Sequence, residues 1–320
     1  MTLKTTSGLA LISGGLDSIL AALLVKEQGI KVTGLTFKSL FFDPEVEAKK
    51  ILRQIKIPFK IIDFSEKHLK VVKNPYYGYG KNANPCLDCH LLMLKTAKKL
   101  MLSQGYRFII TGEVLGQRPF SQNQASLNLL EKQSGLKDLI LRPLSAKLLK
   151  ITIPEQKGLV NRHKLLDLCG RSRREQLKLA KKYNLKSFSA PGTSCILTDP
   201  YFTKRLLRLL KVNPKAQASD VGLLKLGRLF WHPQGSDPQK GQTLMVIGRN
   251  HQENLKLIKI VQKGDIILEP QSFPGPTILI RSYGKKPSNQ FINEAKKLFL
   301  KYASKAPKKL CKKDIKVSRY

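Results

Sequence analysis

A glycine- and serine-rich hexapeptide follows the first apolar stretch of the chain. It lies between a strand-like run at residues 8–12 and a helix-like run at 19–25. Adjacent glycines let backbone N–H groups turn toward an anion, and the following helix adds its positive end. The segment therefore predicts a nucleotide phosphate site, although it lacks the Gly-Lys-Ser/Thr of a Walker A loop. The residues assigned to this site are Ser13, Gly14, Gly15, Leu16, Asp17 and Ser18.

The side chains of this hexapeptide suit a phosphate and its metal ion. The hydroxyl groups of Ser13 and Ser18 can donate hydrogen bonds to phosphate oxygens. Asp17 can cap the helix or help to hold Mg²⁺. We therefore expect a nucleotide phosphate and Mg²⁺ as the ligands here.

Three cysteines in or next to predicted loops form a second candidate constellation. Cys86 and Cys89 make a Cys-x-x-Cys motif that precedes an expected helix, and a thiolate is favoured near a helix N-terminus. Cys195 follows a Pro-Gly-Thr-Ser segment. Three interpretations stay open: a 4Fe-4S cluster on three thiolates, Zn²⁺ with His90 as fourth ligand, or a persulfide and disulfide pair. Unrelated buried cysteines are the remaining alternative.

A second glycine-bearing segment runs from Thr111 to Arg118, directly after an apolar strand. Loops at the carboxyl ends of parallel strands face one crevice, so we expect this segment beside the hexapeptide. Its glycines permit close approach to a nucleotide, and its last two residues are polar donors. The further residues that we assign to the nucleotide site are Thr36, Phe37, Thr111, Gly112 and Gln117.

Alternating strand-like and helix-like segments from residue 8 to about 141 predict a Rossmann-like α/β fold with a parallel sheet. The expected strands cover 9–13, 32–37, 59–63, 108–111 and 139–141. The expected helices cover 43–55 and 91–103, and residues 151–185 also look helical. Short strands after residue 213 indicate a second, smaller α+β domain. The expected division is a nucleotide domain at 1–187, a cysteine-bearing connector at 188–215, the small domain at 216–302 and a basic tail at 303–320.

The chain carries 58 Lys and Arg against 22 Asp and Glu, a net charge of +36. This excess favours a polyanionic partner, and nucleic acid is preferred over a general lysine bias or an adaptation for solubility. The arginines that we assign to RNA binding are Arg171, Arg173, Arg174 and Arg249. No apolar run reaches the roughly 20 residues that span a bilayer, and five cysteines do not suggest a secreted disulfide framework. We therefore expect a cytoplasmic protein without a membrane partner.

These motifs resemble those of a known group of enzymes. The hexapeptide is similar to the PP-loop of ATP pyrophosphatases, which cleave ATP between the α and β phosphates. The segment 111–117, the Arg142-Pro143-Leu144 motif and the position of Cys195 resemble the tRNA 4-thiouridine synthetases. A looser likeness exists to the tRNA 2-thiouridylases and to thiolases with a three-cysteine 4Fe-4S cluster. The likeness covers roughly residues 8 to 200, and we expect neither the THUMP region nor the rhodanese region of many thiouridine synthetases.

The C-terminal part carries a weaker likeness. Gly248-Arg249-Asn250, followed by Glu253 and Asn254, and the segment 273–276 resemble RNA-binding domains of the NFACT-R type. Such a domain would bind tRNA in place of a THUMP region.

The resemblance implies an adenine nucleotide alpha hydrolase type of Rossmann-like domain and an ATP-dependent tRNA sulfurtransferase. Such an enzyme adenylates a uridine carbonyl and replaces its oxygen with sulfur, and 4-thiouridine is favoured over 2-thiouridine as its product. The catalytic residues that it implies are Cys195, Cys86, Cys89 and Asp17. The cluster is preferred over Zn²⁺ or a persulfide because three thiolates are present without a rhodanese. The implied partners are tRNA and a sulfur donor, either sulfide or a cysteine desulfurase, and a homodimer is also considered.

Two other functions stay open at this point. A PP-loop ligase or amidotransferase that uses ammonia shares the phosphate loop but needs neither the three cysteines nor so basic a surface. A non-catalytic RNA-binding factor would need only the C-terminal domain, and the intact hexapeptide argues against it.

Overall fold

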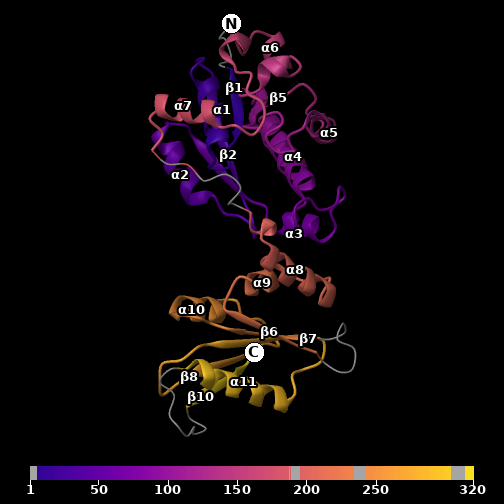
Figure 1. Ribbon diagram of the computed structural model, residues 1–320, viewed down its shortest axis with the longest axis vertical. Coiled ribbons are helices and arrows are strands. Elements are labelled where there is room, and N and C mark those ends of the chain that lie inside the picture. The colour runs from indigo at the N-terminus through magenta and orange to yellow at the C-terminus, as the bar shows by residue number, and fades with distance from the viewer. Residues whose placement is uncertain (1–5, 187, 189–194, 234–241, 304–313) are drawn as a thin grey trace. The chain divides into compact units, whose positions relative to one another are not determined.

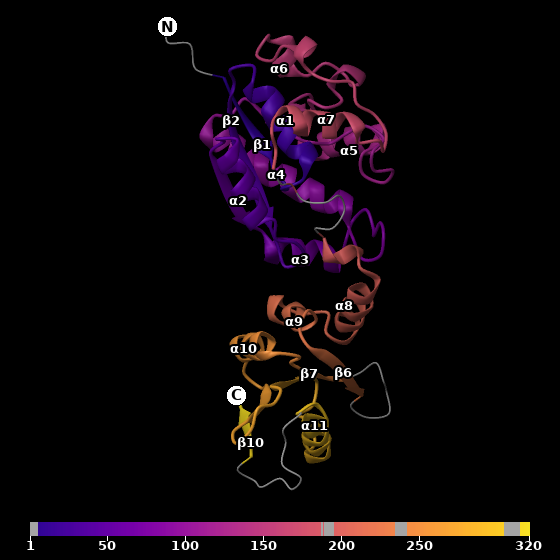
Figure 2. The same cartoon turned by 60° about the vertical axis from the view of Figure 1, so that its left-hand side comes forward.

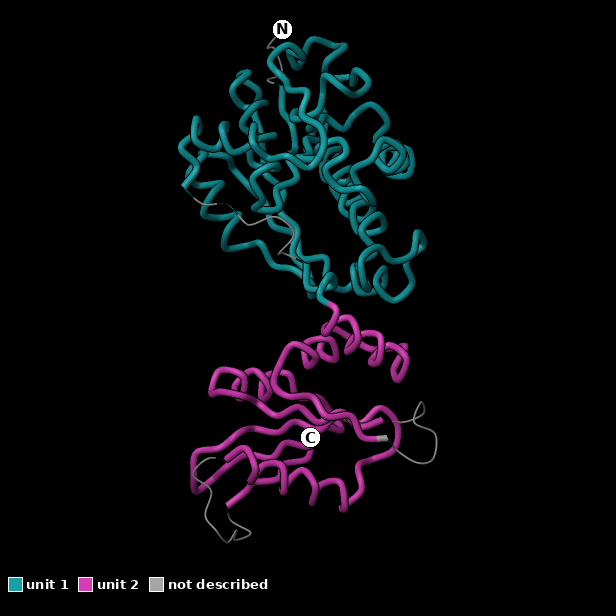
Figure 3. Tube along the Cα trace, in the orientation of Figure 1, with its two compact units in different colours: residues 1–199 teal, residues 200–320 magenta. Residues whose placement is uncertain are grey.

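The computed structural model describes residues 6–186, 188, 195–233, 242–303 and 314–320. The chain divides into two compact units, residues 1–199 and 200–320 (Figures 1 and 3). The division lies between Asp199 and Pro200, inside the stretch that we expected as a connector.

The first unit is built on a parallel sheet of five strands. The strands are β1 (Ser7–Leu11), β2 (Lys31–Lys38), β3 (Phe59–Asp63), β4 (Phe108–Ile110) and β5 (Ile140–Leu141). Their order across the sheet is β3-β2-β1-β4-β5, and each neighbouring pair is parallel. The predicted Rossmann-like α/β fold is confirmed.

Helices cover both faces of this sheet (Figure 2). One face packs against α1 (Leu16–Lys26), α2 (Glu45–Gln54) and α7 (Arg174–Lys182), and the other against α4 (Cys86–Gln104) and α5 (Gln124–Ser134). Helix α3 (Ser65–Lys73) follows β3 and contacts α4. Successive strand residues point to opposite faces, so Phe108 and Ile110 join the first core while Ile109 joins the second. A strand buried on both faces must be apolar throughout, as β4 is.

The strand order places two loops side by side. The chain leaves β1 toward β2 on one side, whereas β4 pairs with β1 on its other side. A crevice forms at the carboxyl ends of the strands where the order reverses. The hexapeptide after β1 and the segment after β4 therefore meet there.

After β5, the described residues 142–186, 188 and 195–199 form mainly loops with short helical turns. These are η1 (Ala146–Leu148), α6 (Ile153–Gln156), η2 (Arg162–Lys164) and η3 (Ile196–Thr198), in addition to α7. The prediction of a helical stretch over 151–185 was wrong for residues 157–173, which form loops apart from η2, whereas its last part is helical as α7. The apolar residues of this stretch, such as Val160 and Leu165, fill the core from loops.

The second unit is an antiparallel sheet with helices, as predicted for a small α+β domain. Its strands are β6 (Arg228–Pro233), β7 (Gln242–Ile247), β8 (Ile266–Pro270), β9 (Ile278–Tyr283) and β10 (Ile315–Arg319), in the order β10-β8-β9-β7-β6. Its helices are α8 (Pro200–Val212), α9 (Ala218–Leu223), α10 (His251–Lys259) and α11 (Asn289–Tyr302). Phe291, Ala295 and Phe299 of α11 pack on the sheet.

The C-terminal segment differs from the expected basic tail over 303–320. Residues 315–319 form β10, which pairs with β8 in antiparallel register. Ile315 is buried and Val317 packs against the same core, while Lys316 and Ser318 alternate with them. The period of two was present in the sequence, but the surrounding lysines dominated its composition.

Candidate nucleotide and thiol site

The hexapeptide forms a loop that opens helix α1. Gly14 has a φ of +76°, a conformation that favours glycine, and Gly15 is the N-cap of α1. The Ser18 hydroxyl donates to the Gly15 carbonyl at 2.8 Å, and the Ser13 N–H donates to the Ser18 hydroxyl oxygen at 3.3 Å. Leu16 is fully buried and anchors the start of the helix. The loop has the geometry of an anion site at a helix N-terminus.

Gly112 fixes the neighbouring loop against this helix start. A Cβ atom at Gly112 would lie 2.4 Å from the backbone nitrogen of Ser18 and 2.6 Å from the carbonyl carbon of Asp17. Only glycine permits so close a backbone approach. The predicted adjacency of Gly112 and the hexapeptide is thus present in the structure.

Asp17 gathers polar groups from two distant segments. Gln117 Nε2 donates to Asp17 Oδ2 at 3.2 Å, and Arg173 reaches the same oxygen at 3.4 Å. The other carboxylate oxygen, Oδ1, is buried without a hydrogen-bond partner among the described residues, and so is Arg173 Nε. An orphaned acceptor and an orphaned donor at one place suit a ligand that brings both a cation and an anion. A metal-bound nucleotide phosphate is such a ligand, so the residues present fit Mg²⁺ at Asp17.

The arginines of the basic cluster at 171–174 have different surroundings. Arg173 faces Asp17, whereas Arg171 and Arg174 are exposed. All three were predicted to bind RNA from their shared composition. Sequence reasoning missed the contact of Arg173 because its partner lies 156 residues away in the chain.

The remaining predicted nucleotide residues lie deeper in the sheet. The Thr36 side chain is fully buried, and its Oγ1 has no hydrogen-bond partner among the described residues. The ring of Phe37 packs in the core against Phe64, with centroids 5.2 Å apart. The hydroxyl of Thr111 donates to Glu113 at 3.0 Å. These three side chains therefore support the loops from within the fold.

A buried ion network underlies the loop after β4. Glu113 accepts from Arg142 Nε at 2.9 Å and lies 3.6 Å from His90 Nδ1, and Arg142 also pairs with Glu131. Burial would raise the pKa of Glu113, but the charges and hydrogen bonds of Arg142 and His90 together lower it to about 2. The network joins the loops after β4 and β5 to helices α4 and α5. It also engages the histidine that was considered as a zinc ligand.

The three predicted cysteines are brought into one neighbourhood by two segments, the start of α4 and the residue before η3. Cys86 is the first residue of α4, which begins five residues before the predicted helix at 91–103, and Cys89 lies one turn later and is buried. Cys195 precedes η3, where the Ile196 N–H donates to the Phe41 carbonyl at 2.9 Å and Asn82 donates to the Thr198 carbonyl at 2.6 Å. The charge of Cys195 acts on Cys89, and the charge of Cys86 acts on both Cys89 and Cys195, so the three thiols lie close together.

Burial, however, disfavours the thiolates. It raises the pKa of Cys86, raises that of Cys89 well above its usual range and, with the nearby Cys86, raises that of Cys195 to about 11. The positive charge of Arg118 acts in the opposite direction on Cys86 and Cys195. The expectation of thiolates favoured by the helix N-terminus is therefore wrong for this state, because desolvation outweighs the helix dipole.

The three thiols are suitable donor atoms for a metal ion or cluster, but among the described residues their arrangement does not form a metal site. Cys86, Cys89 and Cys195 are free thiols in the structure. In the described part of the chain, no group of three or more His, Cys, Asp or Glu side chains is arranged to hold a metal ion. Of the two remaining cysteines, Cys169 is exposed and Cys311 lies outside the described residues.

Arg249 lies in the second unit and has a partner. Its side chain is 53% exposed and pairs with Glu253, with Nε–Oε2 at 3.0 Å. This partner also accepts from the backbone N–H groups of Arg249 and Gly227. Asn250 caps α10, and Asn254 would collide with a Cβ at Gly248. Much of the Gly-Arg-Asn motif is therefore structural, and one face of Arg249 stays open to solvent.

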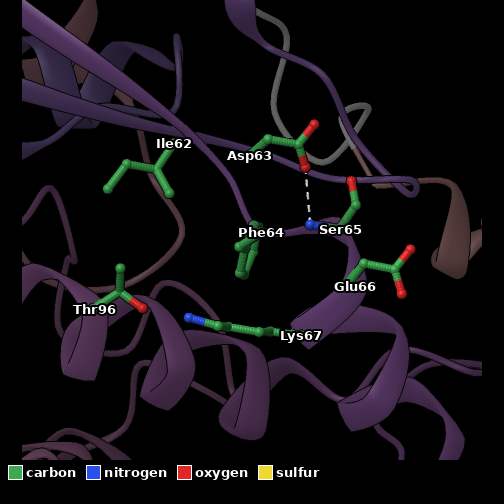
Figure 4. A pocket seen from close by; sticks show the side chains of 7 residues that line it. All are labelled: Ile62, Asp63, Phe64, Ser65, Glu66, Lys67 and Thr96. Carbon is green, nitrogen blue, oxygen red and sulfur yellow. Dashed lines mark hydrogen bonds between the residues drawn. The ribbon is translucent and has the colours of Figure 1, made fainter.

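Two pockets lie away from the phosphate loop. One, of about 430 Å³, is lined by the start of α3, the end of β3 and Thr96 of α4 (Figure 4). In it the Ser65 N–H donates to Asp63 at 2.9 Å, and the hydroxyl and N–H of Ser65 lower the pKa of this carboxyl. The other, of about 550 Å³, lies over Glu131 and Arg142. We therefore take the open loops beside Asp17, and neither pocket, as the candidate site.

Two family models match this chain. Residues 4–151 match the family described as thiamine biosynthesis protein (ThiI), and residues 239–319 match the NFACT protein RNA-binding domain. The resemblance that the motifs indicated is confirmed. We call these segments the ThiI-type region and the NFACT-R-type region. The first holds the PP-loop, Cys86 and Cys89, and the second holds Arg249.

Curated relatives agree with the ThiI-type region. The chain is 37% identical over 98 residues to the tRNA-specific 2-thiouridylase MnmA of Syntrophomonas wolfei, covering 28% of this chain and 29% of that protein. It is 29% identical over 141 residues to the MnmA of Deinococcus radiodurans, covering 38% and 36%. The chain thus matches about a third of the length of these relatives.

One solved structure is also similar to this chain. The crystal structure of a 4-thiouridine synthetase–RNA complex with bound ATP has a TM-score of 0.40 and 18% identity, covering 69% of this chain and 52% of that one. Among the helices described here, none has both the length and the apolar character needed to traverse a bilayer.

Proposed function

We propose that this protein is an ATP-dependent tRNA sulfurtransferase that converts a uridine to a thiouridine. The observation that carries the proposal is the loop after β4. Its Gly112 packs on the PP-loop, its Gln117 donates to Asp17, and its Arg118 acts on the charges of Cys86 and Cys195. One loop therefore joins a nucleotide site to a thiol site. A reaction that first adenylates a substrate and then delivers sulfur needs these two sites next to each other.

In the first step, the uridine carbonyl oxygen attacks the α phosphorus of ATP and pyrophosphate leaves. The PP-loop N–H groups and Arg173 neutralise the phosphate charge that develops. Asp17, whose Oδ1 lacks a partner, would hold Mg²⁺. The metal ion would supply further positive charge to the phosphates. The base is left with an adenylated oxygen and an electrophilic ring carbon.

In the second step, sulfur forms a bond to that ring carbon and AMP leaves with the original oxygen. Cys86, Cys89 and Cys195 are the thiols beside the reaction. A 4Fe-4S cluster, when bound, would be held by these three thiolates and would supply sulfur chemistry beside the adenylated base. The raised pKa values of the free thiols favour this proposal over an unassisted persulfide, because a bound cationic centre stabilises the thiolates that burial penalises.

tRNA is the substrate that the surface and the comparisons support. The net charge of +36 favours a polyanion, and the NFACT-R-type region is similar to an RNA-binding domain. Arg171, Arg174 and the open face of Arg249 are the arginines that we propose to contact phosphates. Sulfide or a cysteine desulfurase is proposed as the sulfur source. We favour 4-thiouridine over 2-thiouridine because the segment 111–117 resembles that of the 4-thiouridine synthetases.

The decisive experiment is mass spectrometry of tRNA nucleosides from a strain that lacks this gene, beside its parent. We expect the loss of one thionucleoside, and its restoration by the wild-type gene but not by a Cys195→Ala gene. An unchanged thionucleoside profile, with no redundant enzyme present, would overturn the proposal. Pyrophosphate release with tRNA, with ammonia or with neither then identifies the substrate that is adenylated.

A further inference from the structure

The exposed aromatic side chains of the first unit are confined to one place. In its described residues, three Phe, Tyr or Trp side chains are exposed: Tyr76 (85%), Phe120 (45%) and Tyr79 (37%). They come from two loops, residues 74–85 before α4 and residues 111–123 after β4. The first loop ends at Cys86, and the second carries Arg118. We call Tyr76 and Phe120 the aromatic rim.

The two loops of the rim are in contact. A Cβ at Gly80 would lie 3.3 Å from two ring atoms of Phe120, so this ring covers the backbone of the first loop. The hydroxyl of Tyr79 donates to the Val72 carbonyl at 2.6 Å and ties this residue to the end of α3. Tyr79 is therefore a structural residue of the loop, while the rings of Tyr76 and Phe120 present open surface.

A buried carboxylate fixes Tyr76 relative to the thiols. Asp88 lies between the two cysteines of the Cys-x-x-Cys motif, is 8% exposed, and accepts from the N–H groups of Tyr76 at 3.1 Å and Tyr77 at 3.0 Å. The ring of Tyr77 packs against the core and meets that of Tyr76 edge-on, with centroids 4.8 Å apart. The ring of Tyr76 is thus held in position while most of its surface faces solvent.

An aromatic ring that is held in place and left exposed costs hydrophobic free energy unless a partner covers it. Its partner must tolerate positive charge, because Arg118 and Lys81 are exposed on the same two loops. Flat, unpaired nucleobases on a phosphate backbone meet both conditions, since they stack on aromatic rings and carry negative charge. A paired duplex does not meet them, because its bases are already stacked.

We propose that the aromatic rim stacks unpaired bases of the RNA substrate beside Cys86, so that a uridine outside its helix is held at the thiol site. This inference rests on the proposed function for the identity of the RNA, but the binding surface can be tested without catalysis. Stacking on the rim offsets the loss of base stacking when the uridine leaves its helix.

The test measures binding of a short oligouridylate that carries a central 5-bromouridine, with a blunt RNA duplex of matched length as comparison. The variants are Tyr76→Ala, Phe120→Ala and Tyr76→Phe. The matched control is Leu102→Ala, which removes an exposed apolar side chain about 24 Å along the same helix from Cys86. Fluorescence anisotropy gives the affinities, and ultraviolet cross-linking with peptide mapping locates the base.

We expect each alanine variant to bind the oligouridylate about tenfold more weakly, in line with the loss of one stacked base. Tyr76→Phe and Leu102→Ala should bind as the wild type does, and duplex affinity should not change in any variant. The cross-link should map to Tyr76 or Phe120. Three outcomes would each reject the proposal that the rim stacks unpaired bases. They are unchanged oligouridylate affinity in both alanine variants, a cross-link confined to residues 200–320, and an equal loss of duplex affinity.

The aromatic rim and the proposed function can be rejected independently of each other. Rim-dependent binding in a protein whose gene deletion leaves all thionucleosides intact would reject the sulfurtransferase and keep the base-binding surface. A lost thionucleoside together with rim-independent binding would keep the sulfurtransferase and reject the rim.

Discussion

Gly112 makes the sharpest prediction at the scale of single residues. Its replacement by Ala places a methyl group 2.4 Å from the Ser18 nitrogen, so the PP-loop and the loop after β4 must move apart. We expect the affinity for a non-hydrolysable ATP analogue to fall at least tenfold, as measured by titration calorimetry. Gly222→Ala is the control, because no atom lies within 4 Å of its added Cβ in helix α9. Equal affinities in the two variants would contradict the assigned nucleotide site.

Arg173 and Arg174 are adjacent arginines for which different ligands are predicted. Arg173→Gln removes the charge beside Asp17, and we expect the ATP analogue to bind roughly 10- to 100-fold more weakly, the range for a charged hydrogen bond. Its affinity for tRNA should stay within about twofold. Arg174→Gln, at an exposed position, should weaken tRNA binding and leave ATP binding unchanged. Loss of tRNA binding alone in Arg173→Gln would restore the sequence-based assignment of Arg173.

The thiols should react slowly at neutral pH in metal-free, reduced protein. Burial and the nearby Cys86 raise the pKa of Cys195 to about 11, so its thiolate fraction grows about tenfold for each pH unit below that value. We expect alkylation of Cys195 by iodoacetamide to accelerate in this way between about pH 7 and 10. The exposed Cys169 is the internal reference, and peptide mass spectrometry follows both. Equal rates at pH 7 would show that Cys195 is not buried in solution.

At the scale of elements, the buried network around Arg142 ties loops to helices. Arg142→Leu leaves Glu113 and Glu131 without their cation, and we expect the free energy of unfolding to fall by about 3–5 kcal/mol. Urea denaturation measures this loss. Lys150→Ala is the matched control, since its exposed pair with Asp138 at 3.8 Å should contribute less than about 1 kcal/mol. Similar losses in both variants would mean that the network does not stabilise the fold.

The same network makes the free energy of unfolding depend on pH in the acidic range. Burial raises the pKa of Glu113, but Arg142 and His90 lower it to about 2, below its ordinary value of 4.5. A lowered pKa stabilises the fold above the ordinary value, and this contribution of about 3 kcal/mol is lost as the pH falls toward 2. Glu113→Gln should therefore show a shallower loss of stability than the wild type between about pH 5 and 2, as measured by urea midpoints. Parallel curves would exclude Glu113 as a source of the acid sensitivity.

The elements themselves could be predicted where the sequence pattern is strong. Strand β3 at 59–63 was predicted at its observed bounds, because a short apolar run there follows a proline. Residues 157–173 were misassigned as helix, since an apolar loop that fills a core can have the same composition as a helix. Strand β10 was not predicted, because lysines dominate the composition of the segment around it. Periodicity identifies an element only when the residues around it do not carry a stronger signal.

At the scale of the whole molecule, the net charge of +36 predicts a steep dependence of RNA binding on salt. Neutralising phosphates releases counterions, so the logarithm of the tRNA affinity should fall linearly with the logarithm of salt concentration. We expect a loss of at least about tenfold between roughly 50 and 200 mM KCl, measured by filter binding. The stacking on Tyr76 should persist, because it does not depend on charge. An affinity independent of salt would contradict the phosphate contacts.

The sequence by itself determined the glycine-rich hexapeptide, the Cys-x-x-Cys motif, the five strands of the first unit and the charge. These properties are local, because a glycine pair, a cysteine spacing or an apolar run has the same physical consequence wherever it lies. Only the tertiary structure decided which of them meet. Arg173 reaches Asp17 across 156 residues and Gln117 reaches it across 100, so neighbouring composition could not reveal either contact. Burial, which raises the pKa values of the thiols and leaves Tyr76 exposed, is likewise a property of the packed fold.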